Sequence, residues 1–509
     1  MKKFSVVFYV SAAIVGMLVL LGIAVPERLE AFTASMQGAI SNYFGWYYLI
    51  IVSLFVFVCL YLFVSPIGRI KLGKQEDKPE FSRPTWLAML FSAGMGIGLV
   101  FWGTAEPISH YAVSSPTGTE GTDQGIIDSM RFTFFHWGIH AWAIYGIVAL
   151  VLAYFTFRKG EKGLISATLK PILGRHADGV PGKMIDIIAV IATVVGVATT
   201  LGFGAVQING GLSYLFGTPS NFAMQAVIIG VVTILFMISA LTGLSKGIKI
   251  LSNTNMILAF ILFGAMFILG PTLFTLNLFT DTLGRYMQNI VTMSFRISPL
   301  NEESRSWING WTIFYWAWWI AWAPFVGIFI ARISKGRTIR EFVASVLLVP
   351  SLIGFIWFSV FGGSALNLEH NGTAVISNLA TEESLFGVLA NFPFGLTLSI
   401  LAMVLIGTFF ITSADSGTYV LGMMTTNGSQ NPDRIVKITW GVLLSLTSLA
   451  LLYSGGLQAL QNTMIIAALP FSLIMGLMTI SLIKALRQEV LEPASRKEFV
   501  KKEKKAYSA

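Results

Sequence analysis

Twelve apolar runs, each of about 20 residues or more, punctuate this chain of 509 residues. About 20 apolar residues let an α-helix cross the hydrocarbon core of a bilayer, and a helix satisfies its own backbone hydrogen bonds there. Charged residues make up only 12% of the chain, about half the share usual in soluble domains. We therefore predict an all-α integral membrane protein with twelve transmembrane helices. The predicted spans cover approximately residues 5–25, 46–65, 85–104, 132–156, 184–213, 222–243, 250–276, 308–331, 342–362, 395–424, 435–455 and 460–483.

Positive charge gathers in alternate connections between these spans. Of the 34 Lys and Arg residues, 29 lie in segments that are cytoplasmic if the N-terminus is inside, and five lie in outer segments. The positive-inside rule then predicts that both termini are cytoplasmic. Lys2 and Lys3 precede the first run, which we interpret as a retained span and not as a cleaved signal peptide. Since the net charge of +9 resides in these connections, it does not indicate nucleic-acid binding.

Spans 3–7 and 8–12 form two sets of five that run in opposite directions, because span 3 starts inside and span 8 starts outside. This is the geometry of an inverted repeat, and spans 1 and 2 are then accessory helices. The expected divisions are 1–84 (two accessory helices and an inner loop), 85–277 (first five-helix repeat), 278–306 (outer connecting helix region), 307–484 (second five-helix repeat) and 485–509 (basic cytoplasmic tail).

A run of alternate glycines interrupts span 3, at Gly94, Gly96 and Gly98. Glycine costs about 1 kcal/mol per residue against alanine within a helix. An unwound turn at membrane depth is tolerated where it lines a cavity or is buried in protein, and its free backbone groups can hold a carboxylate or a cation. Close packing of two helices through small residues explains the pattern equally well.

Span 8 is rich in aromatic residues: Trp311, Tyr315, Trp318 and Trp322 are spaced i, i+4, i+7 and i+11 and share one helix face. A trimethylammonium group offers no hydrogen-bond donor, but aromatic faces bind such a cation by about 0.5–2 kcal/mol per ring. The alternative is an aromatic belt at the membrane interface, but the central tryptophans lie mid-span. A second aromatic set on span 4 comprises Trp137, Trp142 and Tyr145.

Span 10 carries adjacent hydroxyls at Thr412 and Ser413, which suit a hard cation such as sodium. On the residues alone, hydrogen bonding between helices is the favoured interpretation. His136 and His140, four residues apart on span 4, have no acid or cysteine at ligand spacing. We therefore expect hydrogen-bonded histidines there and not a metal site. Asp415 is interpreted as a structural or gating partner.

Four segments together resemble the betaine/choline/carnitine transporter family, and most closely its sodium-coupled glycine betaine carriers of bacteria. The segments are Gly94–Pro107, His136–Tyr145, Trp311–Arg340 and Phe409–Ser416. The resemblance implies a LeuT-like two-times-five inverted repeat, a homotrimer and a place in the bacterial inner (plasma) membrane. It also implies an aromatic box around the trimethylammonium group, formed by Trp137, Trp142, Tyr145, Trp318, Trp319 and Trp322.

The resemblance implies further site residues. Phe101 and the turn of Gly94, Gly96 and Gly98 would face the substrate. The first sodium site would use Met95, Phe409, Thr412 and Ser413. The second would use Thr193 and Phe325.

Three positions bear on ion coupling. Val197 stands one turn after Thr193, where the family pattern can have threonine, so the second sodium site is in doubt. Gly98 stands where proton-coupled choline members tend to have Asp, and Met256 where sodium-independent exchangers tend to have Arg. The last two positions favour sodium coupling and a fully methylated zwitterion, with Na⁺ as the coupling ion and no cofactor.

Other functions remain as alternatives. A carnitine, choline or dimethylsulfoniopropionate carrier would use the same box. An ion channel would be blocked by the central tryptophans, and an enzyme would need convergent acids or metal ligands. No catalytic residue is expected, and the sequence contains no P-loop, HExxH or GxSxG motif. The basic tail after Lys484 could contact anionic lipids as part of an osmotic sensor, or be a solvated tail.

Overall fold

The computed structural model describes residues 4–94, 96–242 and 245–506, and these residues are predominantly helical. Within those ranges the only β pairing is an isolated bridge between Lys71 and Thr338. The chain begins with α1 (Val6–Ala24) and α2 (Pro26–Val64). Because Pro26 occupies the first turn of α2, where its missing N–H costs nothing, the helix starts 20 residues before the predicted span at 46–65.

The next two predicted spans are broken helices. Span 3 consists of α3 (Arg83–Gly94) and α4 (Ile97–Ile108), and a π-helical turn, η2 (Ser109–Val113), follows α4. Span 4 consists of α5 (Asp123–Trp137) and α6 (Ile139–Ala153). Gly138 separates α5 from α6, and a Cβ atom at this position would lie 2.6 Å from the carbonyl oxygen of Phe134. The second break therefore requires glycine.

Long helices make up most of the remaining chain. They are α8 (Val180–Phe216), α9 (Phe222–Thr242), α10 (Ser245–Leu269), α11 (Thr272–Ser294), α13 (Thr312–Ile333), α14 (Ile339–His370), α16 (Gly395–Thr425) and α17 (Arg434–Ala506). Shorter helices are α7 (Lys170–Leu173), α12 (Glu302–Gly310) and α15 (Ser384–Leu389). Two non-helical residues, Gly455 and Gly456, divide α17 into two helices across a kink.

Ten helices of the described chain are long and apolar enough to cross a membrane. This confirms a multi-pass, all-α membrane protein. The two halves of span 3 have 12 residues each and are too short to count singly, whereas α17 is counted once although its kink divides it. The number twelve, the division of the chain and the inverted repeat therefore stay predictions.

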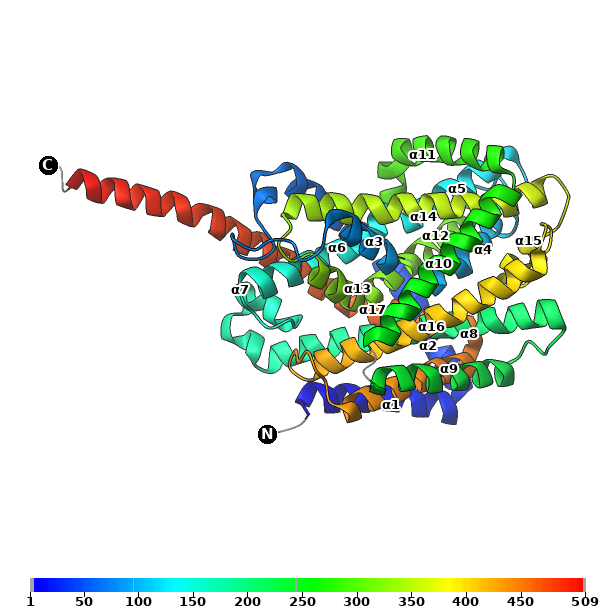
Figure 1. The fold of residues 1–509 in the computed structure, drawn as a ribbon, viewed down its shortest axis with the longest axis horizontal. Coiled ribbons are helices and arrows are strands. Elements are labelled where there is room, and N and C mark those ends of the chain that lie inside the picture. Colours follow the sequence, from blue (N-terminus) through cyan, green and yellow to red (C-terminus); the bar gives the residue numbers. More distant parts are fainter. Residues whose placement is uncertain (1–3, 95, 243–244, 507–509) are drawn as a thin grey trace.

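The tryptophan-rich helix α13 lies inside the bundle. It packs against α6, α8 and α17, and α11 and α14 run along the upper edge of the view while α1 and α9 run along the lower edge (Figure 1). Apart from Trp322, every residue of α13 from Thr312 to Pro324 is buried. The last part of α17 leaves the body of the molecule, and the side chains of the basic tail lie outside the described part of the chain.

Candidate functional site

The site begins at the break in span 3. Helix α3 ends at Gly94, and Gly96 caps α4 with an extended backbone (φ −165°, ψ −176°). The glycine pattern therefore marks an unwound turn, while Met95 lies outside the described residues. A Cβ atom at Gly98 would stand 2.5 Å from Cη2 of Trp318 and 3.4 Å from Cη2 of Trp137. The absence of a side chain at Gly98 thus lets two aromatic rings approach the first turn of α4.

Three tryptophans form the centre of an aromatic cluster. The rings of Trp318 and Trp319 stack with centroids 5.1 Å apart and an interplanar angle of 6°. Trp137, the last residue of α5, meets the ring of Trp319 edge-on at 4.9 Å and that of Trp318 at 6.0 Å. All three side chains are buried, so the cluster lies in the interior and is not an interfacial belt.

Helix α6 extends this cluster. Tyr145 meets Trp319 edge-on at 5.8 Å, and Trp142 meets Tyr145 at 5.5 Å. The indole N–H of Trp319 donates to the carbonyl oxygen of His136, at 2.9 Å, near the break between α5 and α6. The aromatic sets of spans 4 and 8 therefore meet, and five of the six predicted box residues belong to one cluster.

Trp322, the sixth predicted box residue, lies one turn further along α13. Its ring meets Phe325 edge-on at 5.2 Å, and its indole N–H donates to the carbonyl oxygen of Gly196 in α8, at 2.8 Å. Thr193, also in α8, donates its hydroxyl to the carbonyl oxygen of Ala189, at 2.7 Å. The elements predicted for the second sodium site thus adjoin Trp322.

Phe101 lies on α4 behind the cluster. It stacks on Phe203 of α8 with ring centroids 5.2 Å apart, and Phe203 meets Trp318 edge-on at 5.3 Å. Phe101 therefore reaches the tryptophans through a second phenylalanine, which sequence spacing did not single out.

Three of the four residues predicted for the first sodium site, Phe409, Thr412 and Ser413, lie on one face of α16, and the fourth, Met95, lies outside the described residues. The hydroxyl oxygen of Thr412 is 3.1 Å from the carbonyl oxygen of Phe409, to which it donates. Asn255 of α10 donates its side-chain amide to the same hydroxyl at 3.1 Å. Ser413 is half-buried beside them. Two of the predicted oxygens are therefore neighbours, and Asn255 was missed because it lies on another helix.

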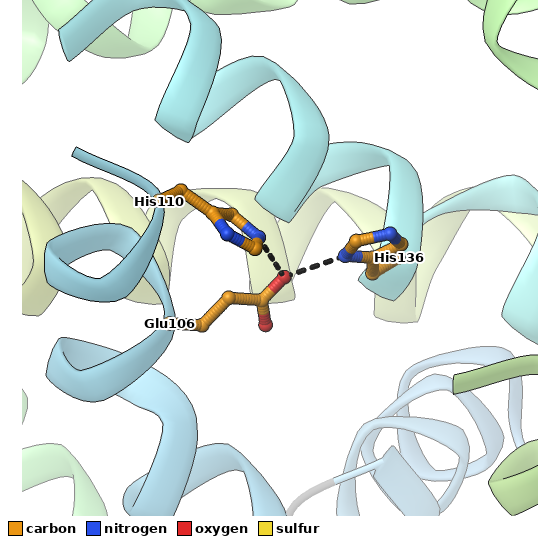
Figure 2. A group of neighbouring side chains, drawn as sticks. All are labelled: Glu106, His110 and His136. Atoms are coloured by element: carbon orange, nitrogen blue, oxygen red, sulfur yellow. Dashed lines mark hydrogen bonds and ion pairs between the residues drawn. The ribbon is translucent and has the colours of Figure 1, made fainter. Parts of the chain in front are cut away.

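A buried carboxylate that no sequence pattern indicated, Glu106, connects the cluster to two histidines and a tyrosine. Figure 2 shows the rings of His110 and His136 on two sides of one oxygen of Glu106. This oxygen, Oε1, lies 3.3 Å from Nε2 of His110 and 2.7 Å from Nδ1 of His136. The other oxygen accepts from the indole of Trp137 at 2.7 Å and from the hydroxyl of Tyr315.

This network corrects one prediction about the histidines. An acid does accompany His136, but it comes from span 3, 30 residues earlier. Glu106 was missed because span 3 was predicted to end at residue 104, whereas α4 continues to Ile108. Both histidines are hydrogen-bonded as expected, since His140 bonds the hydroxyl of Ser294 at 2.8 Å.

Asp415, the intramembrane acid of α16, accepts a hydrogen bond from the hydroxyl of Ser239 in α9 at 2.6 Å. It lies on the helix that carries Thr412 but bonds a different neighbouring helix. Asp186, near the start of α8, likewise accepts from the backbone N–H and the hydroxyl of Ser166, at 2.9 and 2.7 Å. Both acids therefore bond neighbouring segments of the protein.

Comparison with known proteins gives the affiliation of the chain. The model of the betaine/carnitine/choline transporter family matches residues 6–491. The glycine betaine transporter OpuD of Bacillus subtilis is 58% identical over 99% of this chain and 97% of its own length. A probable glycine betaine transporter of Desulfitobacterium hafniense is 44% identical (96% and 98% covered), and an ectoine/hydroxyectoine transporter of Virgibacillus pantothenticus is 46% identical (94% and 96% covered). The chain therefore belongs to the betaine/carnitine/choline family of membrane transporters and is not an enzyme.

Proposed function

We propose that this protein takes up glycine betaine together with sodium and thereby protects the cell against osmotic stress. The observation that carries the proposal is the buried cluster of Trp137, Trp318, Trp319 and Tyr145, built from the two halves of the broken span 4 and from helix α13. Aromatic faces in a desolvated interior attract a quaternary ammonium group, and each ring contributes about 0.5–2 kcal/mol.

The cluster also offers a partner for the other end of a zwitterion. The indole N–H of Trp318 is buried and has no hydrogen-bond partner among the described residues. A buried donor without a partner costs about 1–3 kcal/mol, and a carboxylate would satisfy it. The unwound turn before α4 adds backbone N–H groups at a helix N-terminus, where anions are stabilised.

The relatives support the same substrate. Two of them carry the name glycine betaine transporter, one at 58% identity and one, as probable, at 44%. The relative named for ectoine and hydroxyectoine is 46% identical, so ectoine belongs among the competitors to be tested, beside carnitine, choline and dimethylsulfoniopropionate. We propose transport by alternating access around this site, which lies between two broken spans and the central helix α13.

Sodium coupling is proposed from the oxygens of Phe409 and Thr412, which are neighbours on α16, and from Gly98 and Met256, which leave the site without an added charge. Glycine betaine is neutral overall, so each sodium ion carries one charge and gains about 2.3 kcal/mol per 100 mV. At about 1.4 kcal/mol per tenfold ratio, one ion supports more than tenfold accumulation from voltage alone.

A second sodium site is less well supported. Val197 packs toward α16, because a Cβ atom at Gly417 would stand 3.0 Å from its Cγ1. An apolar side chain in this place offers no ligand to a cation. We also propose that the protein is a homotrimer in the bacterial inner membrane. Both termini are then cytoplasmic, and the basic tail contacts anionic lipids.

Uptake by purified protein in proteoliposomes tests this function. We expect uptake of radiolabelled glycine betaine that requires an inward sodium gradient, and weaker competition by carnitine, choline and ectoine. Sodium-independent uptake, or choline or ectoine preferred over glycine betaine, would contradict the proposal. Liposomes without protein and an imposed potassium gradient in place of sodium serve as controls.

A further inference from the structure

One carboxylate connects three elements that meet at the aromatic cluster. Glu106 lies on α4, His136 and Trp137 end α5, and Tyr315 lies on α13. Glu106, His136 and Tyr315 have exposed fractions of 0%, and Trp137 has 7%. A charged side chain in a membrane interior is costly, so a carboxylate in this position calls for a specific function.

The hydrogen bonds of Glu106 leave neither oxygen free. Oε1 accepts from His110 and His136, and Oε2 accepts from Trp137 and Tyr315. A carboxylate has about four acceptor positions, so these four donors saturate it. Nε2 of His136 lies 3.0 Å from the hydroxyl oxygen of Thr312, which can donate to it. A neutral His136 with its proton on Nδ1 satisfies both bonds.

We propose that Glu106 is a positioning residue of the substrate site, whose acceptor oxygens orient Trp137 and Tyr315. The proposal rests on the function given above. Trp137 meets both stacked tryptophans, and Tyr315 also contacts them, with ring centroids 6.0 Å from Trp318 and 5.9 Å from Trp319. Through these two donors Glu106 holds the broken span 3, the end of α5 and helix α13 in one arrangement. The site needs the acceptors and not the negative charge.

A metal site is the competing interpretation, because ligand atoms of Glu106, His110 and His136 lie within 4.8 Å of one another. A metal ion would have to take the lone pair of Nδ1 of His136 and displace its bond to Oε1. The same carboxylate would still be bonded on its other oxygen by Trp137 and Tyr315. The donors already present account for every acceptor position, so the hydrogen-bond interpretation fits better.

Two substitutions distinguish three possible roles of Glu106, namely hydrogen-bond acceptor, negative charge and metal ligand. In Glu106→Gln the amide oxygen can accept from Trp137 and Tyr315, while the NH₂ group donates to the histidines after a change of tautomer. Glu106→Met keeps an unbranched side chain of similar length but leaves both donors unpaired. Binding of glycine betaine is measured by tryptophan fluorescence on purified protein. We expect a Kd within about threefold of wild type for Glu106→Gln and a rise of about tenfold or more for Glu106→Met.

Tyr315→Phe supplies a second route if Glu106→Met fails to reach the membrane. It removes one donor and keeps the ring, so we expect a Kd raised by about threefold to tenfold. The same change made in the Glu106→Gln background should raise Kd by a similar factor. In a Glu106→Met background it should add little, because the acceptor is already gone.

Asp186→Asn is the matched control, since it neutralises another buried acid, away from the cluster. Its Kd should equal that of wild type. A tenfold loss of affinity in Glu106→Gln would overturn the proposal in favour of charge, and stoichiometric Zn²⁺ binding lost in that variant would overturn it in favour of a metal ligand. An unchanged Kd in both Glu106→Met and Tyr315→Phe would also overturn it. If wild-type protein does not bind glycine betaine, the proposed function fails instead.

Discussion

Gly98 is where a single missing side chain decides how close two elements of the site can come. Its hydrogen faces Trp318, and a methyl carbon in its place would lie 2.5 Å from the indole ring. Side-chain carbons in real proteins do not approach other atoms so closely. The ring cannot yield easily, because it is stacked on Trp319 and meets Phe203 on its edge. Packing therefore requires glycine at this position, in addition to the absence of a charged side chain there.

We predict that Gly98→Ala impairs transport through this contact. Overpacking of about 1–3 kcal/mol should raise the KM for glycine betaine about tenfold or more, with similar protein levels in the membrane. Gly230→Ala in α9 is the control away from the site, since Gly230 is exposed and no heavy atom lies within 4 Å of a Cβ there. Equal KM values for the two variants would contradict the prediction.

Trp322 tests whether the cluster includes the residue that joins α13 to α8. We predict that Trp322→Leu abolishes uptake, because it removes both the ring and the donor to Gly196. Trp322→Phe keeps an aromatic face and should retain part of the activity. Radiolabelled uptake normalised to membrane protein measures both variants. An unchanged KM in Trp322→Leu would remove this residue from the site.

Neither residue spacing nor the resemblance indicated the polar network beside the aromatic cluster. Spacing predicted a shared face of four aromatic residues on span 8, and the family resemblance implied the box of six rings, five of which meet in the structure. Glu106 gave no such signal, because one acid just beyond a predicted span end looks like an ordinary loop residue. Its four donors come from three separate segments, and only the folded chain brings them together.

At the scale of elements, α16 combines two kinds of polar contact within two turns. Thr412 faces α10 through Asn255, whereas Asp415 faces α9 through Ser239. The hydroxyl oxygen of Thr412 lies 3.1 Å from the carbonyl oxygens of both Thr408 and Phe409 in its own helix, so its place beside Phe409 follows from helix geometry. The sequence predicted the hydroxyl pair, but which helices face it depends on packing that no local pattern encodes.

We predict that Thr412→Ala weakens sodium coupling. Loss of one oxygen ligand should raise the sodium concentration for half-maximal uptake about tenfold, an effect of about 1.4 kcal/mol, with a smaller change in maximal rate. Thr408→Ala is the control one turn earlier, because its hydroxyl bonds only Val404 and Leu405 of its own helix among the described contacts. The measurement is glycine betaine uptake at graded sodium concentrations. An identical dependence of uptake on sodium in Thr412→Ala and wild type would contradict the prediction.

At the scale of the whole molecule, hydrogen bonds join connecting segments that lie at the same end of the helix bundle. Ser5, next to the N-terminus, donates to Thr425 at the end of α16, at 2.6 Å. Arg158 bonds both Gly73 and Glu489, near the end of the apolar part of α17. All these segments were predicted to be cytoplasmic. In Figure 1 the start of α1, the far end of α17 and α7 accordingly lie toward the left, opposite α15.

The segments predicted to be external meet one another in the same way. Trp307 donates to the carbonyl oxygen of Ser114 at 2.9 Å, and Tyr111 bonds His370 at 2.8 Å. Each of these hydrogen bonds therefore joins segments that charge counting assigned to the same side of the membrane, and the side itself stays a prediction. Charge counting and the apolar runs did not reveal the extent of α2 or the break at Gly138, because helix continuation and unwinding depend on backbone contacts. The break at Gly96, in contrast, was one of the two interpretations of the alternate glycines.

Which end faces the cytoplasm can be tested by cysteine labelling, for which the chain is well suited. Its single cysteine, Cys59, is buried, so wild-type protein should resist a membrane-impermeant maleimide. Ser220 and Asn431 are exposed in connections at opposite ends. We predict that Ser220→Cys is labelled in intact cells and Asn431→Cys only after the membrane is opened, because 29 of 34 basic residues then lie inside. The reverse labelling pattern would invert the orientation, and with it the direction in which the sodium gradient drives the substrate.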